Sequence, residues 1–162
     1  MLNILLEQVK ICEGWKPQTM GSGATGDWLN LKGYSGVLFI VSITQGNASG
    51  GALTVDKAKA TAGTSPSAGI TMNNWAACVD APQTSDAFTK GAAAASIATS
   101  ATGSGSSIYL IDVPASDLGD TYNCVRAVLA SSSASNISAC QAVLYGPRNA
   151  QAIAKMLSGI AD

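Results

Sequence analysis

The chain has 162 residues, enough for one domain with a sizeable core, and charged side chains make up only 12% of it. Its 9 Lys and Arg residues are balanced by 10 acids, so there is no basic footprint for nucleic acid. No apolar run approaches the ~20 residues of a membrane helix, and residues 1–12 lack the basic start of a signal peptide. We therefore expect a protein made in the cytoplasm that binds neither nucleic acid nor membrane.

The low charge also bears on the surface of the folded chain. Ordinary soluble proteins carry about 25% charged residues. A surface of small uncharged side chains is poorly solvated, which favours a protein covered by other subunits. The alternative is a secreted module that Ser and Thr hydroxyls keep in solution.

Residues 1–25 are predicted as an N-terminal arm and loop. The apolar residues of segment 2–11 fit both helical and strand spacing, so its structure is left open. Segment 14–26 contains a proline and several glycines, which predicts a loop.

A β-sandwich core is predicted over residues 26–146. Its strands are rich in β-branched and aromatic residues and span 28–31, 37–43, 53–61, 70–79, 107–113, 122–130 and 137–145. Turns at short intervals, without a repeated strand–helix alternation, predict an all-β, antiparallel sandwich or jelly-roll-like barrel of about 7–8 strands. The last two strands flank a Ser-rich turn and are predicted to form a hairpin.

Two segments have weaker patterns. Residues 87–105 are rich in Ala and Ser but lack an amphipathic stripe, which favours an irregular or weakly paired strand. Residues 147–162 are predicted as a C-terminal tail. Its apolar side chains recur at helical spacing, so a short amphipathic helix or a docking tail is expected; they are Ile153, Met156, Leu157 and Ile160.

The cysteines are predicted to be structural. There is no C-x-x-C pair and no histidine, which argues against a zinc site. Cys124 and Cys140 lie in apolar strand patterns, where cysteine acts as a small buried hydrophobe. A disulfide between them requires maturation outside a reducing cytosol.

Three further patterns are candidate sites. Residues 21–26 match G-x-G-x-x-G, but a strand-like segment follows where nucleotide binding needs a helix. Three acids near one turn could line a calcium site or cap the turn, and capping is favoured; they are Asp112, Asp117 and Asp120. Three tryptophans could form a sugar platform, although a core or subunit interface is favoured; they are Trp15, Trp28 and Trp75.

No pattern indicates an enzyme. Without histidine there is no Ser-His-Asp triad, and no S-x-x-K motif places a Ser-Lys dyad. Asn47 and Asn136 begin glycosylation sequons, which are expected to be turn residues in the absence of a secretion signal. We predict no catalytic, cofactor-binding or metal-binding residues.

Four stretches of the chain resemble, in order, a family of small structural proteins encoded in tailed-bacteriophage genomes. The first is GDWLNLKGYSGVLFIVSITQG at residues 26–46, and the second is GALTVDKAKATAGTSPSAG at 51–69. The others are YLIDVPASDLGDTYNCVRAVLA at 109–130 and AVLYGPRNAQ at 142–151. The chain departs from the family pattern at 91–102, where Ala, Ser and Thr replace a more regular strand.

The resemblance implies a virion head protein of the decoration or cement type. Such a protein is a β-rich homo-oligomer, with a trimer favoured, that binds the outer surface of the major capsid protein lattice. No catalytic residue is implied. The alternative is a tail- or fibre-associated β-sandwich module that recognises host-surface glycans through exposed tryptophans.

Overall fold

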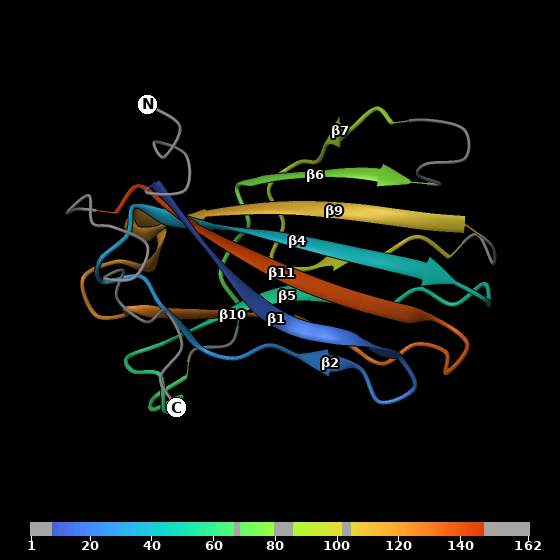
Figure 1. The fold of residues 1–162 in the computed structure, drawn as a ribbon, viewed down its shortest axis with the longest axis horizontal. Helices are drawn as coiled ribbons and strands as arrows, with labels where there is room; N and C mark the ends of the chain where they lie inside the picture. Colours follow the sequence, from blue (N-terminus) through green and yellow to red (C-terminus); the bar gives the residue numbers. More distant parts are fainter. Residues whose placement is uncertain (1–7, 67–68, 80–85, 102–104, 148–162) are drawn as a thin grey trace.

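Two antiparallel β-sheets pack face to face in the computed structural model, which describes residues 8–66, 69–79, 86–101 and 105–147 (Figure 1). Sheet A contains, in spatial order, β1 (Val9–Thr19), β11 (Ile137–Tyr145), β4 (Gly36–Gln45), β9 (Gly105–Pro114), β6 (Asn74–Val79) and β7 (Thr89–Lys90). Sheet B contains β2 (Ala24–Thr25), β10 (Cys124–Leu129), β5 (Ala52–Ala58) and β8 (Ile97–Ala98), while β3 (Leu29–Asn30) pairs with β10. A 3₁₀ helix, η1 (Ala115–Leu118), follows β9.

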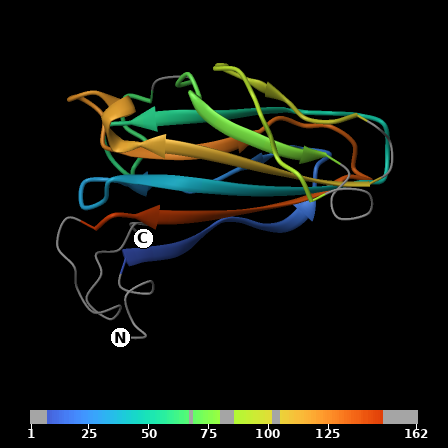
Figure 2. The same ribbon diagram turned by 90° about the horizontal axis from the view of Figure 1, so that it is seen from above.

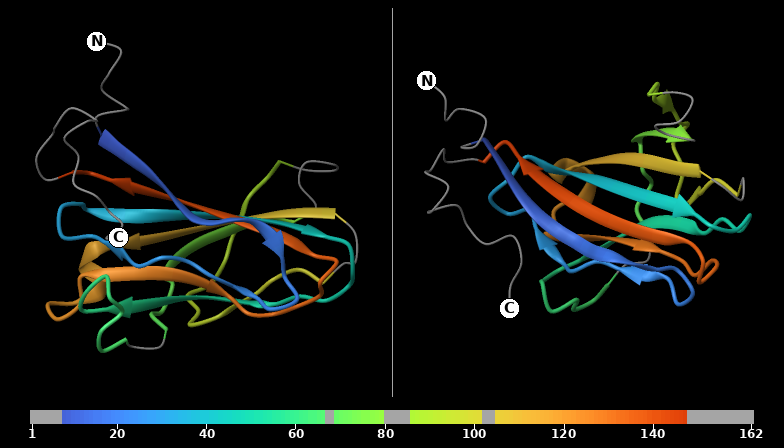
Figure 3. Two further views of the ribbon diagram at one scale, coloured as in Figure 1. Left: turned by 60° about the horizontal axis from the view of Figure 1, so that its bottom comes forward. Right: turned by 45° about the vertical axis from the view of Figure 1, so that its right-hand side comes forward.

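The core lies between the two sheets. Figure 3 shows the layers edge-on, with β4 and β9 in one and β5 and β10 in the other. Alternate side chains of each strand point inward, and the inward set is almost wholly buried; it includes Phe39, Val41, Leu53, Val55, Tyr109, Ile111, Val125 and Leu129. Burying each such side chain stabilises the fold by about 1.5–3 kcal/mol.

The predicted fold class is confirmed, and the strand count is higher than expected. The described residues form 11 strands instead of about 7–8. Four of the additional or shortened strands, β2, β3, β7 and β8, have two residues each. Two residues are too few for alternation to be recognised in a sequence. Between residues 87 and 101, β7 and β8 are the only strands described, so the expected weak pairing there is confirmed.

The predicted loop over residues 14–26 is wrong in its first half. β1 continues through Gly14 to Thr19 as an edge strand of sheet A. Register shifts on either side of Trp15 allow the chain to bend, so that the Trp15 ring is buried and its Nε1 donates to Ser138 Oγ at 3.0 Å. At residue 14 a Cβ would lie 2.6 Å from Cys140 Sγ, so only glycine fits there. Pro17 is tolerated because an edge strand leaves one row of amides unpaired.

The predicted hairpin between the last two strands is also wrong. β10 belongs to sheet B and β11 to sheet A, so the intervening Ser-rich segment crosses from one layer to the other. Buried Asn136 fixes this crossing. Its Oδ1 accepts from the amides of Gly46 and Asn47 at 3.0 Å each, and its Nδ2 donates to the Ser49 carbonyl at 2.8 Å. These bonds join the crossing segment to the turn after β4.

Some predictions fall outside the described residues. They concern the N-terminal residues 1–7, a turn at 81–85 and the amphipathic tail at 149–160. The division into arm, core and tail at residues 25 and 146 stays a prediction.

Candidate functional site

The outer face of sheet A carries a continuous row of apolar side chains. Leu38 and Ile40 of β4 point away from the core because their neighbours Val37, Phe39 and Val41 point into it. The register places further partly exposed apolar side chains beside them: Val143 beside Leu38, and Leu110 beside Ile40. Ile108 lies beside Ser42 on the same face.

A strand that is apolar on both faces is typical of a sheet covered on both sides. β4 is such a strand, yet in the described part of the chain only its inner face meets a second sheet. A shallow depression of about 250 Å³ marks the outer face, lined by Leu38, Asn74, Trp75, Ala76, Lys90, Leu110 and Asp112.

Polar groups lie at both ends of this face and beside its centre, where Gln141 of β11 pairs with Ile40 and Asp112 of β9 pairs with Leu38. Tyr145 donates from its hydroxyl to Asp112 Oδ1 at 2.7 Å. Burial, the hydrogen bond and the negative charge of Asp112 together raise the pKa of the Tyr145 hydroxyl above its ordinary value. This hydrogen bond holds the Asp112 carboxylate of β9 close to β11 in sheet A.

Sheet B has an outer face of the opposite kind. Arg126 on β10 forms an ion pair with Asp56 on β5, with 3.2 Å between Nη2 and Oδ2. The Arg126 guanidinium also lies 4.4 Å from the centre of the Trp28 ring, a cation–π contact. A Cβ at Gly63 would come within 2.6 Å of Trp28 Nε1, so the loop after β5 lies against the Nε1 edge of the indole. Sheet B therefore covers part of its outer face with its own residues.

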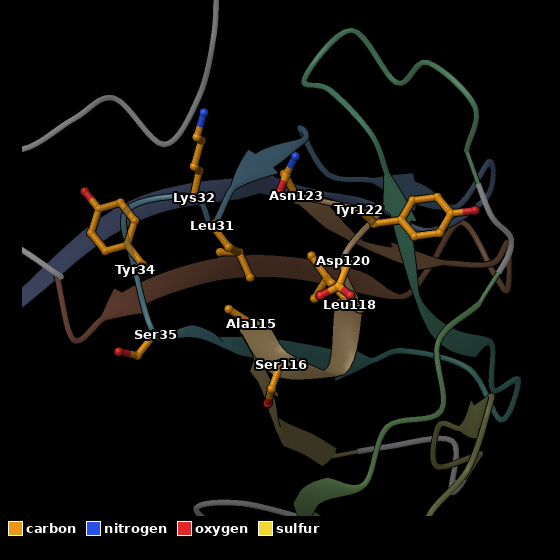
Figure 4. A pocket seen from close by; sticks show the side chains of 11 residues that line it. Leu31, Lys32, Tyr34, Ser35, Ala115, Ser116, Leu118, Asp120, Tyr122 and Asn123 are labelled. Carbon is orange, nitrogen blue, oxygen red and sulfur yellow. The ribbon is translucent and has the colours of Figure 1, made fainter.

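A hollow of about 600 Å³ opens at one end of the sandwich (Figure 4). It lies between the turn after β3 and the segment from η1 to β10. Figure 4 shows Tyr34 and Tyr122 on opposite sides, with Leu31, Leu118 and Asp120 between them. Lys57 Nζ lies 4.7 Å from the centre of the Tyr122 ring and fixes that wall. An aromatic ring beside carboxylate and amide side chains is a chemistry that can bind a polar ring such as a sugar.

The three tryptophans do not form one platform. Trp15 is buried on β1, Trp28 lies against Arg126 on sheet B, and Trp75 on β6 donates from Nε1 to the Ala92 carbonyl at 2.7 Å. β11, β4 and β9 separate β1 from β6 in sheet A. Each indole is thus held by its own local contacts.

The three acids do not converge on a metal site. Asp112 accepts from Tyr145, Asp117 accepts from Asn73 Nδ2 at 3.2 Å, and Asp120 lines the hollow. In the described residues no group of three or more His, Cys, Asp or Glu side chains could hold a metal ion. Residues 21–26 form a turn into β2, and β3 follows where nucleotide binding needs a helix.

All four cysteines are buried with free thiols; they are Cys12, Cys78, Cys124 and Cys140. Burial raises the pKa of the Cys140 thiol to about 12, and it also raises the pKa of Cys12 and Cys124. Such thiols are protonated and unreactive at neutral pH. The structural role predicted for Cys124 and Cys140 is confirmed. Among the described residues no helix is long and apolar enough to cross a membrane.

Comparisons with known proteins give one likeness. No family model matches the chain, and no curated protein matches it. A solved structure, that of the SPBc2 prophage-derived protein YomS, is similar to 85% of this chain over 93% of its own length, at 10% sequence identity and a TM-score of 0.47.

Proposed function

We propose that this chain is a non-enzymatic virion structural protein that binds the outer surface of the major capsid lattice and stabilises the phage head. The observation that carries the proposal is the apolar outer face of sheet A, with Leu38, Ile40 and Leu110 at its centre. Covering such a face lowers the free energy by about 25 cal/mol per Å² of apolar surface removed from water.

Two features of the sequence support this function. The low charge fits a protein whose surface is covered in an assembly. The ordered resemblance to phage structural proteins implies the partners: the major capsid protein and further copies of this chain. Contacts repeated by symmetry need only modest energy each, because binding at many linked sites adds through avidity.

The proposal is tested first by immunogold electron microscopy of virions that carry the protein. Uniform label over the head is expected. Label confined to the tail or fibres would favour the alternative below, and intact particles without label would contradict both.

A matched pair of variants then tests the surface. Ile40→Lys places a charge on the outer face of sheet A, and Thr54→Lys places the same charge on the outer face of sheet B. Co-sedimentation with isolated heads should be lost for Ile40→Lys and retained for Thr54→Lys. Equal loss in the two variants, with both folded, would show that sheet A is not the contact surface.

The second candidate is a tail- or fibre-associated module that binds host glycans. The hollow beside Tyr122 and Asp120 is the observation that favours it. The three tryptophans lie apart and form no platform for a glycan. Host polysaccharide should then change the intrinsic fluorescence of the chain. Asp120→Asn should abolish that change, and Asp27→Asn, at an exposed residue outside the hollow, should not.

A further inference from the structure

The first half of β1 presents an open strand edge. β1 is the terminal strand of sheet A, and β11 is the strand with which it pairs in the described part of the chain. The amide of Gly146 donates to the Gln8 carbonyl at 3.2 Å, so the backbone of residue 8 faces β11. Backbone groups alternate in direction along an antiparallel strand. The N–H and C=O groups of Val9, Ile11 and Glu13 therefore point away from β11.

In the described part of the chain, this edge has neither a bulge nor a proline over a short and regular stretch, although Lys10 and Glu13 carry charges. Register shifts and Pro17 interrupt β1 only after Glu13. The stretch Val9–Glu13 pairs with β11 without a shift. At its centre Ile11 is 64% exposed, the most exposed of the large apolar side chains in the described residues. An apolar side chain beside unpaired backbone groups is a template for another strand.

We propose that this edge pairs with the same edge of a second copy, antiparallel and about a twofold axis at Ile11. In this register Ile11 faces Ile11 of the second copy, and Val9 faces its Glu13. All three outward-facing residues then exchange hydrogen bonds with the other copy. The occupant is an extended strand of identical sequence.

The charges of the edge disfavour two other registers. Moving the axis to Lys10 would place two ammonium groups opposite each other, and moving it to Glu13 would do the same with two carboxylates. Like charges directly opposite in a sheet are destabilising. An axis at Ile11 avoids both clashes and buries the exposed isoleucine against its symmetry mate. An isologous contact of this kind closes as a dimer.

The dimer would enlarge the surface used in the proposed function without depending on it. Two six-stranded sheets joined at β1 form one continuous sheet. The apolar rows of both copies then lie on the same side of that sheet. This unit is a twofold pair, in place of the trimer that the family resemblance implies.

Charge-swap variants at residue 11 test the pairing in sedimentation velocity experiments on the full chain. The wild type should be a dimer, and Ile11→Lys and Ile11→Asp should each be monomeric. An equimolar mixture of the two variants should regain the dimer, because opposite charges then face each other across the axis. Ile137→Lys, at another exposed isoleucine of sheet A, is the matched control and should remain dimeric.

A proline variant tests the backbone contribution. The Ile11 amide is not part of the β1–β11 ladder, so Ile11→Pro removes an outward donor and leaves the internal pairing in place. It should raise the dimer dissociation constant at least about tenfold, with Ile11→Thr affected less. A monomeric or trimeric wild type, or a mixture of charge variants that stays monomeric while both are folded by circular dichroism, would overturn the proposal. Failure to bind heads would leave these results unchanged, so the two proposals fail separately.

Discussion

The outer faces of the two sheets differ in how their side chains are satisfied. On sheet B the guanidinium of Arg126 meets the carboxylate of Asp56 and the ring of Trp28, so its charge and the adjacent aromatic surface are paired within the chain. On sheet A Ile40 and Leu110 lie side by side and are partly exposed in the described part of the chain. A face paired within the chain needs no partner, whereas an apolar face gains free energy when another surface covers it.

Figure 2 shows the two sheets as separate layers. The view from above separates β1, β11 and β4 of sheet A from β5 of sheet B. The loop before β3 places Trp28 against Arg126 of sheet B, and the loop after β5 places Gly63 against Trp28. The described loops leave the middle of β4 partly exposed on its outer side.

The largest difference in the free energy of unfolding is expected between substitutions at two neighbouring residues of β4. Phe39 is 1% exposed on the inner face, so Phe39→Ala should lower the free energy of unfolding by about 3–5 kcal/mol. Ile40→Ala, one residue further on the outer face, should cost less than about 1 kcal/mol in the isolated chain, because Ile40 is only partly buried there.

Urea denaturation of both variants at equal, low protein concentration measures the difference. A loss at Ile40 as large as that at Phe39 would mean that the outer face of sheet A is already covered in the free chain. That face would then not be available as the contact surface.

The sequence predicts that strand 37–43 is buried, but it does not predict the open edge at β1. Residues 37–43 are apolar at every position except Ser42, which predicts a buried strand. At β1, Gly14 and Pro17 indicated a loop. The tertiary contact that overrides this propensity is the packing of Gly14 against Cys140, which lies 126 positions later in the numbering.

The hollow and the layer crossing could not be predicted for a related reason. The walls of the hollow come from Leu31–Ser35 and Ala115–Asn123, two segments that no local pattern connects. The crossing depends on the buried amide of Asn136, whose partners Gly46 and Ser49 belong to a distant turn. Alternation within a strand reports its two faces, but it does not report which sheet the strand joins.

An intermediate effect is expected from Cys140, on the inner face of sheet A. Its pKa is about 12 in the folded chain and close to 9 when unfolded, so the unfolded thiol loses its proton first as the pH rises. The folded state then binds more protons, and stability falls with increasing pH above 9. Between pH 8 and 10.5 the thiol alone should account for about 2 kcal/mol of that loss.

The measurement is the free energy of unfolding as a function of pH for the wild type and Cys140→Ala. The variant has a lower stability at neutral pH because it leaves a small cavity, but its decline above pH 9 should be shallower. Other buried groups with raised pKa values, such as Tyr109 and Cys124, contribute equally to both proteins and cancel in the comparison. Parallel curves would show that Cys140 is accessible to hydroxide in the folded state.

The smallest effect on the free energy of unfolding is expected at Arg126, on the outer face of sheet B. Arg126 and Asp56 are 28% and 19% exposed, so solvent screens their ion pair and limits its contribution to well under 1 kcal/mol. The stacking on Trp28 adds a similar amount. Arg126→Ala should therefore lower the free energy of unfolding by about 1 kcal/mol, and Arg126→Lys should recover only part of it, because a lysine cannot present the planar group that stacks and bonds at once.

Salt separates the two contributions in the same variants. Raising the ionic strength should weaken the ion pair and leave the contact with the ring nearly unchanged, so the gap between wild type and Arg126→Ala should narrow without closing. Neither Arg126→Ala nor Arg126→Lys should change head binding. Arg126 lies on the outer face of sheet B, where its charge is paired within the chain. If Arg126→Ala abolished head binding and Ile40→Lys did not, the two faces would exchange roles, and sheet B would be the surface that contacts the capsid.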